Sequence, residues 1–225
     1  MATAEAQFAI LSKIITTKEA DVRLYLIRHG QTEYNKQRMI QGHTEVPLNA
    51  TGIAQAKLMA RRMAGVSLDR IYASDLRRTE MTATILSGET GVPVQYEPLF
   101  RERHPGQLTN GTYEDAEPFF TDLDYEPPGG ESVPVFMDRV KAAFDTLLAI
   151  EGGTSNNVAV VSHGMVCAAF VRGCLGMTQE KVAATSWPNT ALTIADYENE
   201  WRLVTLTDAS HLDGMEEGVS HSTGA

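Results

Sequence analysis

Two histidines, each followed by glycine, are the residues in this sequence best placed to carry chemistry. Arg28 and His29 directly follow an apolar run at 22–27, and His163 follows a second apolar run at 157–162. Ligands of an open parallel sheet bind beyond the carboxyl ends of its strands, so the two histidines are expected to share one crevice. Neutral imidazole can attack phosphorus, and a guanidinium group matches phosphate oxygens with a planar fork. The pattern therefore indicates phosphate chemistry.

A second anion-binding segment is predicted where a strand at 68–73 ends. Ser74 or Asp75 is expected to cap a helix here, and an arginine in the first turn of that helix could close over the same phosphate. Arg77 and Arg78 point about 100° apart on a helix, so only one of them is expected to face the crevice. Taken alone, this segment also fits a capped surface helix with solvated arginines.

A third group of polar residues offers an acid. Glu102 stands among charged residues at 101–104, and its carboxyl group could protonate a leaving oxygen. Taken alone, the same cluster fits a solvated charged loop, just as each histidine taken alone fits a hydrogen-bonded core residue. The functional interpretation depends on the segments being brought together.

The elements that must position these residues follow from the periodicity. Strand and helix patterns alternate, which predicts an α/β fold with a mostly parallel open sheet and helices on both faces. Pro93 favours an edge position for its strand, because proline cannot donate to a ladder. A C-terminal antiparallel hairpin is expected at 191–197 and 201–207. The remaining strands are predicted at 22–28, 68–73, 92–96 and 157–162, and the helices at 51–65, 74–88, 133–151 and 164–175.

Length and composition favour one large globular domain, since the chain has 225 residues of which 43% are hydrophobic. We expect an N-terminal extension at 1–20, the main domain at 21–212 with a loop-rich cap insertion at 98–132, and a disordered tail at 213–225. The net charge of -10, without any basic run, argues against nucleic acid and membrane as partners. No apolar run reaches the ~18 residues of a membrane span.

Other sequence features point to a cytoplasmic protein. The first twenty residues lack the order of a signal peptide. Cys167 and Cys174 are expected on one helix about 10.5 Å apart, beyond the ~7 Å limit for a disulfide. They are interpreted as small core residues in a reducing compartment, with a catalytic thiol as the alternative.

Taken together, the segments resemble the histidine phosphatase superfamily, also called phosphoglycerate-mutase-like, over roughly residues 21–208. The resemblance implies that family's fold and selects Arg78 over Arg77 as the pocket arginine, through an S-x-x-x-R pattern. The matching segments are Arg28 to Asn35 (RHG-[EQ]-T-x-x-N), Gln41 and Gly42 through Pro47 to Ala56, Ser74 to Arg78, Glu102, Pro128 to Ser132 (P-x-G-E-S), and Val161 to Gly164.

The resemblance also implies a role for each residue. His29 would become phosphohistidine, with its other ring nitrogen held by a backbone carbonyl. Arg28, Arg78 and His163 would bind the phosphoryl oxygens through the transition state. Glu102 would protonate the departing alcohol and then deprotonate water. The implied substrate-binding residues are Arg28, Asn35, Gln41, Gly42, Arg78, Glu102 and Gly164.

Such an array supplies its own positive charge and nucleophile, so neither a metal nor a cofactor is implied. A zinc site built from His29, His43, His104 and His163 is the alternative. The neighbouring arginines would repel a cation there.

Three functions fit the resemblance. The segment Glu102 to Gly106 is similar to the E-R-H-x-G of cofactor-dependent phosphoglycerate mutases, but the cap is short and lacks their paired arginines. A short cap leaves a phosphohistidine open to water. We therefore predict a histidine acid phosphatase-type phosphoric monoester hydrolase that acts without metal on a small phosphorylated metabolite. The alternatives are a phosphoglycerate mutase and a non-catalytic phosphate-binding or interaction module.

The cap is where the sequence departs from the family pattern. The stretch from Gly106 to Gly111 has one extra residue and lacks the acid of G-x-[WL]-[ED]-G, so Glu114 or Asp115 could replace Glu102 as proton donor. Four aromatic residues could line a substrate pocket or simply close the cap: Tyr113, Phe119, Phe120 and Tyr125. The hairpin at Trp201 could provide the edge strand of a homodimer, or it could pack under the helix at 133–151.

Overall fold

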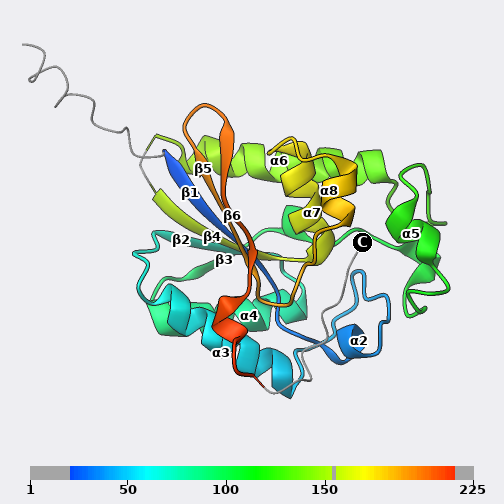
Figure 1. The fold of residues 1–225 in the computed structure, drawn as a ribbon, viewed down its shortest axis with the longest axis horizontal. Helices are drawn as coiled ribbons and strands as arrows, with labels where there is room; N and C mark the ends of the chain where they lie inside the picture. Colours follow the sequence, from blue (N-terminus) through cyan, green and yellow to red (C-terminus); the bar gives the residue numbers. More distant parts are fainter. Residues whose placement is uncertain (1–20, 154–155, 216–225) are drawn as a thin grey trace, which may run out of the picture.

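The computed structural model describes residues 21–153 and 156–215. The six strands in this part of the chain form one sheet in the order β3-β2-β4-β1-β5-β6, and helices cover both of its faces (Figure 1). The predicted α/β fold class is thereby confirmed. The expected extension at 1–20 and residues 216–225 of the expected tail lie outside the described residues, and the proposed division into domain, cap and tail stays a prediction.

The strand pairing brings the two histidine segments side by side. β1 pairs with β4 in parallel, with Arg28 opposite Ser162. β4 also pairs in parallel with β2, and β2 pairs in parallel with β3. β5 pairs with β1 and with β6 in antiparallel fashion, as predicted for the C-terminal hairpin. β3 is an edge strand, as Pro93 indicated. The strands span Val22–Arg28 (β1), Arg70–Ala73 (β2), Val94–Tyr96 (β3), Asn156–Ser162 (β4), Leu192–Tyr197 (β5) and Trp201–Asp208 (β6).

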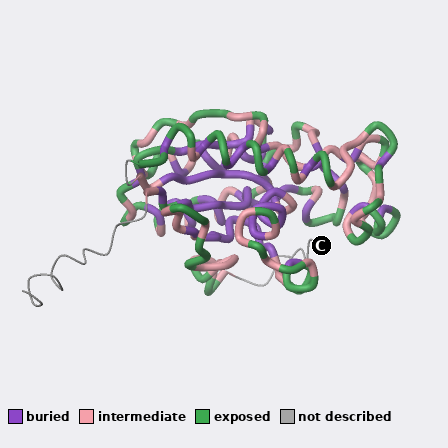
Figure 2. The backbone as a smooth tube through the Cα atoms, turned by 90° about the horizontal axis from the view of Figure 1, so that it is seen from above, coloured by how far each residue is buried: buried purple, intermediate pink, exposed green. Residues whose placement is uncertain are grey.

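The helices divide between the two faces of the sheet according to the side-chain alternation of the strands. Leu24 and Leu26 of β1 point to a core with α6 and α7, whereas Tyr25 and Ile27 point to a core with α3 and α4. Figure 2 shows the buried strands between these layers. The helices span Glu33–Lys36 (α2), Ala50–Met63 (α3), Arg77–Thr90 (α4), Glu117–Thr121 (α5), Val133–Glu151 (α6), Gly164–Gly173 (α7) and Gln179–Ala183 (α8).

The start of α4 corrects one prediction. Its N-cap residue is Leu76, which makes no side-chain cap hydrogen bond, so neither Ser74 nor Asp75 caps this helix. The Asp75 carboxylate instead accepts two hydrogen bonds from Arg101, at 2.6 and 2.5 Å. The Ser74 hydroxyl is bonded to His163. Partners from other elements have replaced the local capping interaction.

The cap at 98–132 consists of short turns and the five-residue helix α5, packed around one buried arginine. Arg103 donates hydrogen bonds to the backbone carbonyls of Phe119, Tyr125 and Glu131 at 2.8 to 2.9 Å. Its guanidinium group also lies over the Phe119 ring, 4.3 Å from the ring centroid. A single side chain therefore ties together the distant parts of the cap.

Both cysteines belong to the core around α7. Cys167 lies within the helix and Cys174 is its C-terminal cap residue, and both are free thiols. Burial raises the pKa of Cys167 to about 12, which disfavours the thiolate that a catalytic cysteine needs. Among the described helices, none is long and apolar enough to cross a membrane.

Candidate active site

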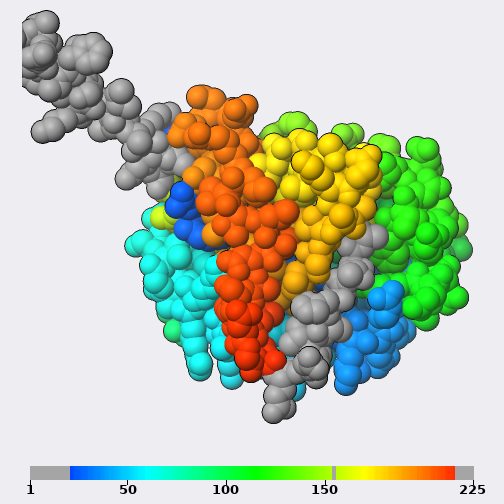
Figure 3. All heavy atoms as spheres, viewed as in Figure 1, coloured from blue at the N-terminus to red at the C-terminus, as the bar shows by residue number. Residues whose placement is uncertain are grey.

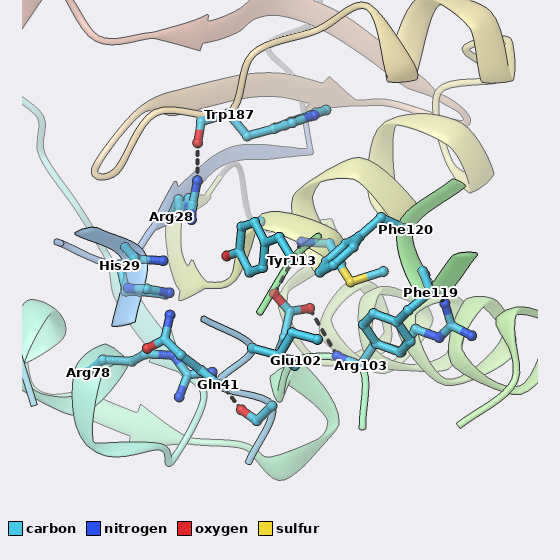
Figure 4. Close-up of a pocket in the computed structure, with 15 residues that line it drawn as sticks. Arg28, His29, Gln41, Arg78, Glu102, Arg103, Tyr113, Phe119, Phe120 and Trp187 are labelled. Atoms are coloured by element: carbon cyan, nitrogen blue, oxygen red, sulfur yellow. Dashed lines mark hydrogen bonds between the residues drawn. The ribbon is translucent and has the colours of Figure 1, made fainter. Parts of the chain in front are cut away.

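A cavity of about 560 Å³ lies between the carboxyl ends of the strands and the cap. It collects every predicted site residue except His163, whose ring packs edge-on against the ring of His29 with centroids 5.3 Å apart. Figure 4 shows residues from the strand ends on one side of this cavity and aromatic residues of the cap on the other. The predicted residues among its lining are Arg28, His29, Asn35, Gln41, Gly42, Arg78, Glu102 and Gly164.

His29 has the geometry and the charge state of a nucleophile. Its Nδ1 lies 2.7 Å from the Gly30 carbonyl oxygen, so the ring proton resides on Nδ1 and Nε2 keeps its lone pair. The predicted backbone contact is thereby confirmed. Burial, together with the charges of Arg78 and Arg28, holds the pKa of His29 well below its ordinary value. The imidazole is therefore neutral at physiological pH.

His163 follows β4 and is completely buried. Its Nε2 lies 2.9 Å from the Ser74 hydroxyl oxygen, which also accepts from the Leu76 backbone N–H. The Ser74 hydroxyl therefore donates its proton to the His163 Nε2. Because Nε2 accepts, the ring proton of His163 resides on Nδ1. Within the described residues, this Nδ1 has no hydrogen-bond partner. It is a donor beside His29 that a phosphoryl oxygen could satisfy.

Arg78 is the arginine of α4 that faces the cavity, as the resemblance predicted, while Arg77 pairs with Glu80 on the surface. Its guanidinium group donates to the carbonyl oxygens of Gly42 at 2.8 Å and Thr44 at 3.1 Å. Burial lowers the pKa of Arg78 to about 10, so the group stays charged at neutral pH.

Gly42 belongs to the loop whose carbonyl oxygens bind Arg78, and it packs closely against Pro105. Its φ is +49°, and a Cβ would meet the Pro105 ring at 2.2 Å. Glycine is therefore required at this position.

Asn35 is held with one amide donor free. Thr32 caps α2 and donates its backbone N–H to the Asn35 Oδ1 at 3.1 Å. The Asn189 amide approaches the same oxygen at 3.4 Å and donates to the His29 carbonyl at 2.9 Å. The Asn35 Nδ2 has no partner in the described part of the chain, which fits a donor for phosphate. Gln41 accepts from the Thr32 hydroxyl at 2.9 Å.

Gly30 and Gly52 meet where the loop that carries His29 contacts α3. A Cβ on Gly30 would meet the Gly52 carbonyl oxygen at 2.5 Å, and one on Gly52 would meet the Gln31 backbone at 2.0 Å. The two glycines let the start of α3 pack directly on the loop that carries His29.

Glu102 lies in the cavity despite the altered sequence after it. Its carboxylate accepts backbone N–H groups of Arg103 at 2.9 Å and Met165 at 3.3 Å. Burial raises the pKa of this carboxyl group above its ordinary value, outweighing those hydrogen bonds and the charge of Arg78. A carboxyl group that holds its proton longer is suited to act as a general acid.

Arg139 fixes the loop that carries Glu102. From α6 it donates to the carbonyl oxygens of Leu99, Arg101 and Glu102 at 2.7 to 3.2 Å, and it pairs with both carboxylate oxygens of Glu131. Glu131 belongs to the P-x-G-E-S segment. Glu131 therefore supports the Glu102 loop indirectly, because it holds Arg139 in place.

The alternative acids lie elsewhere. Glu114 pairs with Arg38 and Asp115 bonds to Thr112, both on the exposed side of the cap. Of the four aromatic candidates, Tyr113, Phe119 and Phe120 line the cavity. Tyr125 packs into the small hydrophobic cluster beneath the cap.

Sequence reasoning missed four residues that orient the site. The Trp187 carbonyl oxygen accepts from Arg28, and Trp187 lines the cavity (Figure 4). Ser74 orients His163, and Asn189 holds the backbone of His29. Arg139 fixes the loop that carries Glu102. Ser74 could have been found from the S-x-x-x-R pattern, but the others act on backbone atoms, which leave no mark in the sequence.

The histidines do not form one cluster. The rings of His43 and His104 pack edge to face with centroids 4.7 Å apart, and His43 bonds to the Glu102 carbonyl. His29 and His163 form a separate pair. In the described ranges, no group of three or more His, Cys, Asp or Glu residues is arranged to hold a metal ion.

Comparison with known proteins shows which family has a similar sequence. The model of the histidine phosphatase superfamily (branch 1) matches residues 24–209. A probable phosphoglycerate mutase of Photorhabdus laumondii is 33% identical in an alignment 207 residues long, which covers 85% of this chain and 95% of that protein.

Two solved phosphatases have the same fold. A mycobacterial glucosyl-3-phosphoglycerate phosphatase is 28% identical with a TM-score of 0.73, covering 82% of this chain and 98% of that one. The α-ribazole phosphatase of Shigella flexneri is 26% identical with a TM-score of 0.75, covering 83% and 96%.

Proposed function

This chain belongs to the histidine phosphatase superfamily, and we propose that it is a phosphomonoesterase that hydrolyses a small phosphorylated metabolite in the cytoplasm through a phosphohistidine on His29. One observation carries the proposal. A neutral His29 with a free Nε2 shares its cavity with two arginines and with Glu102, whose pKa is raised. Nucleophile, anion site and acid are the three parts that such a reaction needs.

In the first step, the His29 Nε2 attacks phosphorus in line with the ester oxygen. The new N–P bond forms as the P–O bond to the alcohol breaks, and Glu102 gives its proton to the departing oxygen. Arg28, Arg78 and the Nδ1–H of His163 bind the oxygens on which charge accumulates. The Asn35 amide adds a fourth donor.

In the second step, Glu102 acts as the base. It takes a proton from a water molecule whose oxygen attacks the phosphohistidine, the N–P bond breaks, and inorganic phosphate leaves. Glu102 then carries the proton for the next cycle, so no external acid is consumed.

Positive charge for the transition state comes from the protein in this scheme. Arg28 and Arg78 flank the nucleophile, so a metal ion placed among them would be repelled. The proposal therefore includes activity without any added metal or cofactor.

A phosphoglycerate mutase is the second candidate, because curated relatives carry that name. A mutase must hold a second anionic group of its substrate. The additional arginine of this cavity, Arg103, already donates to three carbonyl oxygens. This arrangement supports hydrolysis over transfer.

The test is phosphate release from a panel of phosphomonoesters in excess chelator, comparing the wild type with His29→Ala. We expect turnover by the wild type and a fall of at least ~1,000-fold in the variant, because the nucleophile is lost. Arg77→Ala is the control, since Arg77 pairs with Glu80 on the surface and lies outside the cavity lining.

Acid-quenched wild-type enzyme should also carry an acid-labile phosphate that His29→Ala lacks. No phosphate release from any ester would contradict the hydrolase proposal. Movement of phosphate between the positions of a phosphoglycerate, without release, would establish the mutase.

A further inference from the structure

A second cavity lies behind the cap wall of the active site. It has a volume of about 490 Å³, is partly open to solvent and is bordered by α5, α6, α7 and α8. Figure 3 shows the cap, in green, packed against α7 and α8, in yellow. Its walls are mostly apolar and include Val133, Phe136, Met137, Ala168, Ala169 and Val182.

The two cavities share a wall. Arg103, Phe119, Phe120 and Met165 line both of them. The second cavity therefore lies directly beside the active site, and these side chains stand between the two.

Two members of the wall are less buried than the others. Phe120 is only half-buried and makes ring contacts with Tyr113 and Phe119, at centroid distances of 4.8 and 5.1 Å. Met165 is half-buried as well, and its unbranched side chain adapts easily to a neighbour. Arg103 and Phe119 stay fixed, because the carbonyl contacts hold one and the other is 3% exposed.

The wall offers no charge to a second anion. The Arg103 guanidinium group donates to three carbonyl oxygens and lies over the Phe119 ring. The other side chains that line both cavities are those of Phe119, Phe120 and Met165. A carboxylate or a second phosphate held at this wall would lose its hydration without gaining a partner there.

From this adjacency, from the two less buried side chains in the shared wall and from the mostly apolar lining, we infer that the second cavity is the binding site for the distal part of the substrate, which is the phosphate monoester of an extended apolar alcohol. The phosphoryl group lies at His29, and the alcohol chain passes Phe120 and Met165 into the space between α6, α7 and α8. Asp122, Arg172 and Gln179 line the same cavity and can meet a polar end of the chain. This inference rests on the proposed phosphatase activity and names its substrate class.

The test uses a series of straight-chain alkyl phosphates from ethyl to decyl, below their micelle concentrations, with phenyl phosphate as the reference. Each methylene buried in the second cavity should raise kcat/KM by roughly fourfold, since it removes apolar surface from water. We expect a gain of at least ~50-fold across the series, beginning only when the chain is long enough to pass Phe120.

Ala168→Phe fills the second cavity without touching the first, because Ala168 lines only the second. We expect it to lower kcat/KM for decyl phosphate by at least ~10-fold and to leave phenyl phosphate within about twofold. Gln179→Phe fills the same cavity from α8 and guards against a folding defect in the first variant. Ala142→Phe, on the exposed side of α6, is the matched control.

The outcomes separate this inference from the function on which it rests. If the wild type hydrolyses no ester, including phenyl phosphate, the proposed function fails. If phenyl phosphate is hydrolysed but chain length has no effect, or if both cavity-filling variants act equally on short and long esters, the inference is wrong and the phosphatase stands. Decanol that activates phenyl phosphate hydrolysis, where competition is expected, would identify an effector site and also overturn the inference.

Discussion

At the residue scale, the chemistry depends on two groups whose pKa values move in opposite directions. Burial lowers the pKa of His29, and burial raises the pKa of Glu102. In both cases the dry cavity favours the uncharged form, which is the form the first step requires. The same physical cause therefore prepares the nucleophile and the acid.

The pH dependence of catalysis follows from these directions. Activity needs neutral His29, which is retained well below pH 6.5, and protonated Glu102, which is retained above pH 4.5. We expect kcat/KM to be greatest on the acid side of neutrality and to decrease as Glu102 loses its proton. Profiles with phenyl phosphate, corrected for the second ionisation of the ester, measure this. A maximum above pH 7.5 would contradict it.

Glu102→Gln isolates the proton transfer. Alkyl phosphates need a protonated leaving group, so their turnover should fall by ~100- to 10,000-fold. p-Nitrophenyl phosphate needs no such proton, and we expect a burst of one nitrophenolate per enzyme followed by slow release of phosphate. Stopped-flow absorbance measures the burst. Equal losses of the first step for both esters would rule out Glu102 as the acid.

At the scale of the elements, Arg103 acts as a structural tie, because its hydrogen bonds hold distant parts of the cap together. Arg103→Lys should lower the free energy of unfolding by ~2–4 kcal/mol, because an ammonium group cannot reach three divergent carbonyl oxygens and leaves some of them unpaired. Urea denaturation measures the loss.

Arg101→Lys is the control from the same segment. Arg101 and Asp75 have relative side-chain exposures of 37% and 27%, so this change should cost under ~1 kcal/mol. Equal losses in the two variants would show that Arg103 is not the tie.

Several elements were predictable because their signals are local. The buried strand before His29, the helix at 133–151 and the C-terminal hairpin follow directly from periodicity and turn residues. The start of α4 was not, because Asp75 and Ser74 bond to Arg101 and His163 from distant segments. Short helices such as α8 contain too few residues to show a period.

The candidate site divides in the same way. His29 and His163 could be predicted from their type and their position at strand ends, and Arg78 from the family resemblance. The parts that depend on backbone acceptors could not, because every residue carries the carbonyl group through which Trp187 and Gly42 accept hydrogen bonds from arginines. The second cavity likewise depends on how α5 and α8 pack, which no motif records.

At the scale of the whole molecule, we propose that the edge of β6 forms the interface of a homodimer, which is one of the two alternatives for this hairpin. The strand is the last in the sheet, and Leu203 and Val204 are 41% and 50% exposed. Val204→Lys should shift the protein toward monomer in sedimentation equilibrium, since a charge on an edge opposes pairing.

Val135→Lys, at a more exposed position on α6, is the control for this experiment. It should leave the association unchanged. A wild type that is monomeric at high micromolar concentration would contradict the dimer.

The place of β1 within the sheet also determines when the catalytic crevice can first exist. β1 pairs with β4 on one side and β5 on the other, and both follow it by more than half of the chain. At ~5–20 residues per second of synthesis, the strand waits roughly ten seconds for its neighbours. Arg28 and His29 therefore leave the ribosome at the end of an unpaired apolar strand. A nascent chain that has already made its nucleophile cannot use it until β4 and β5 have been synthesised as well.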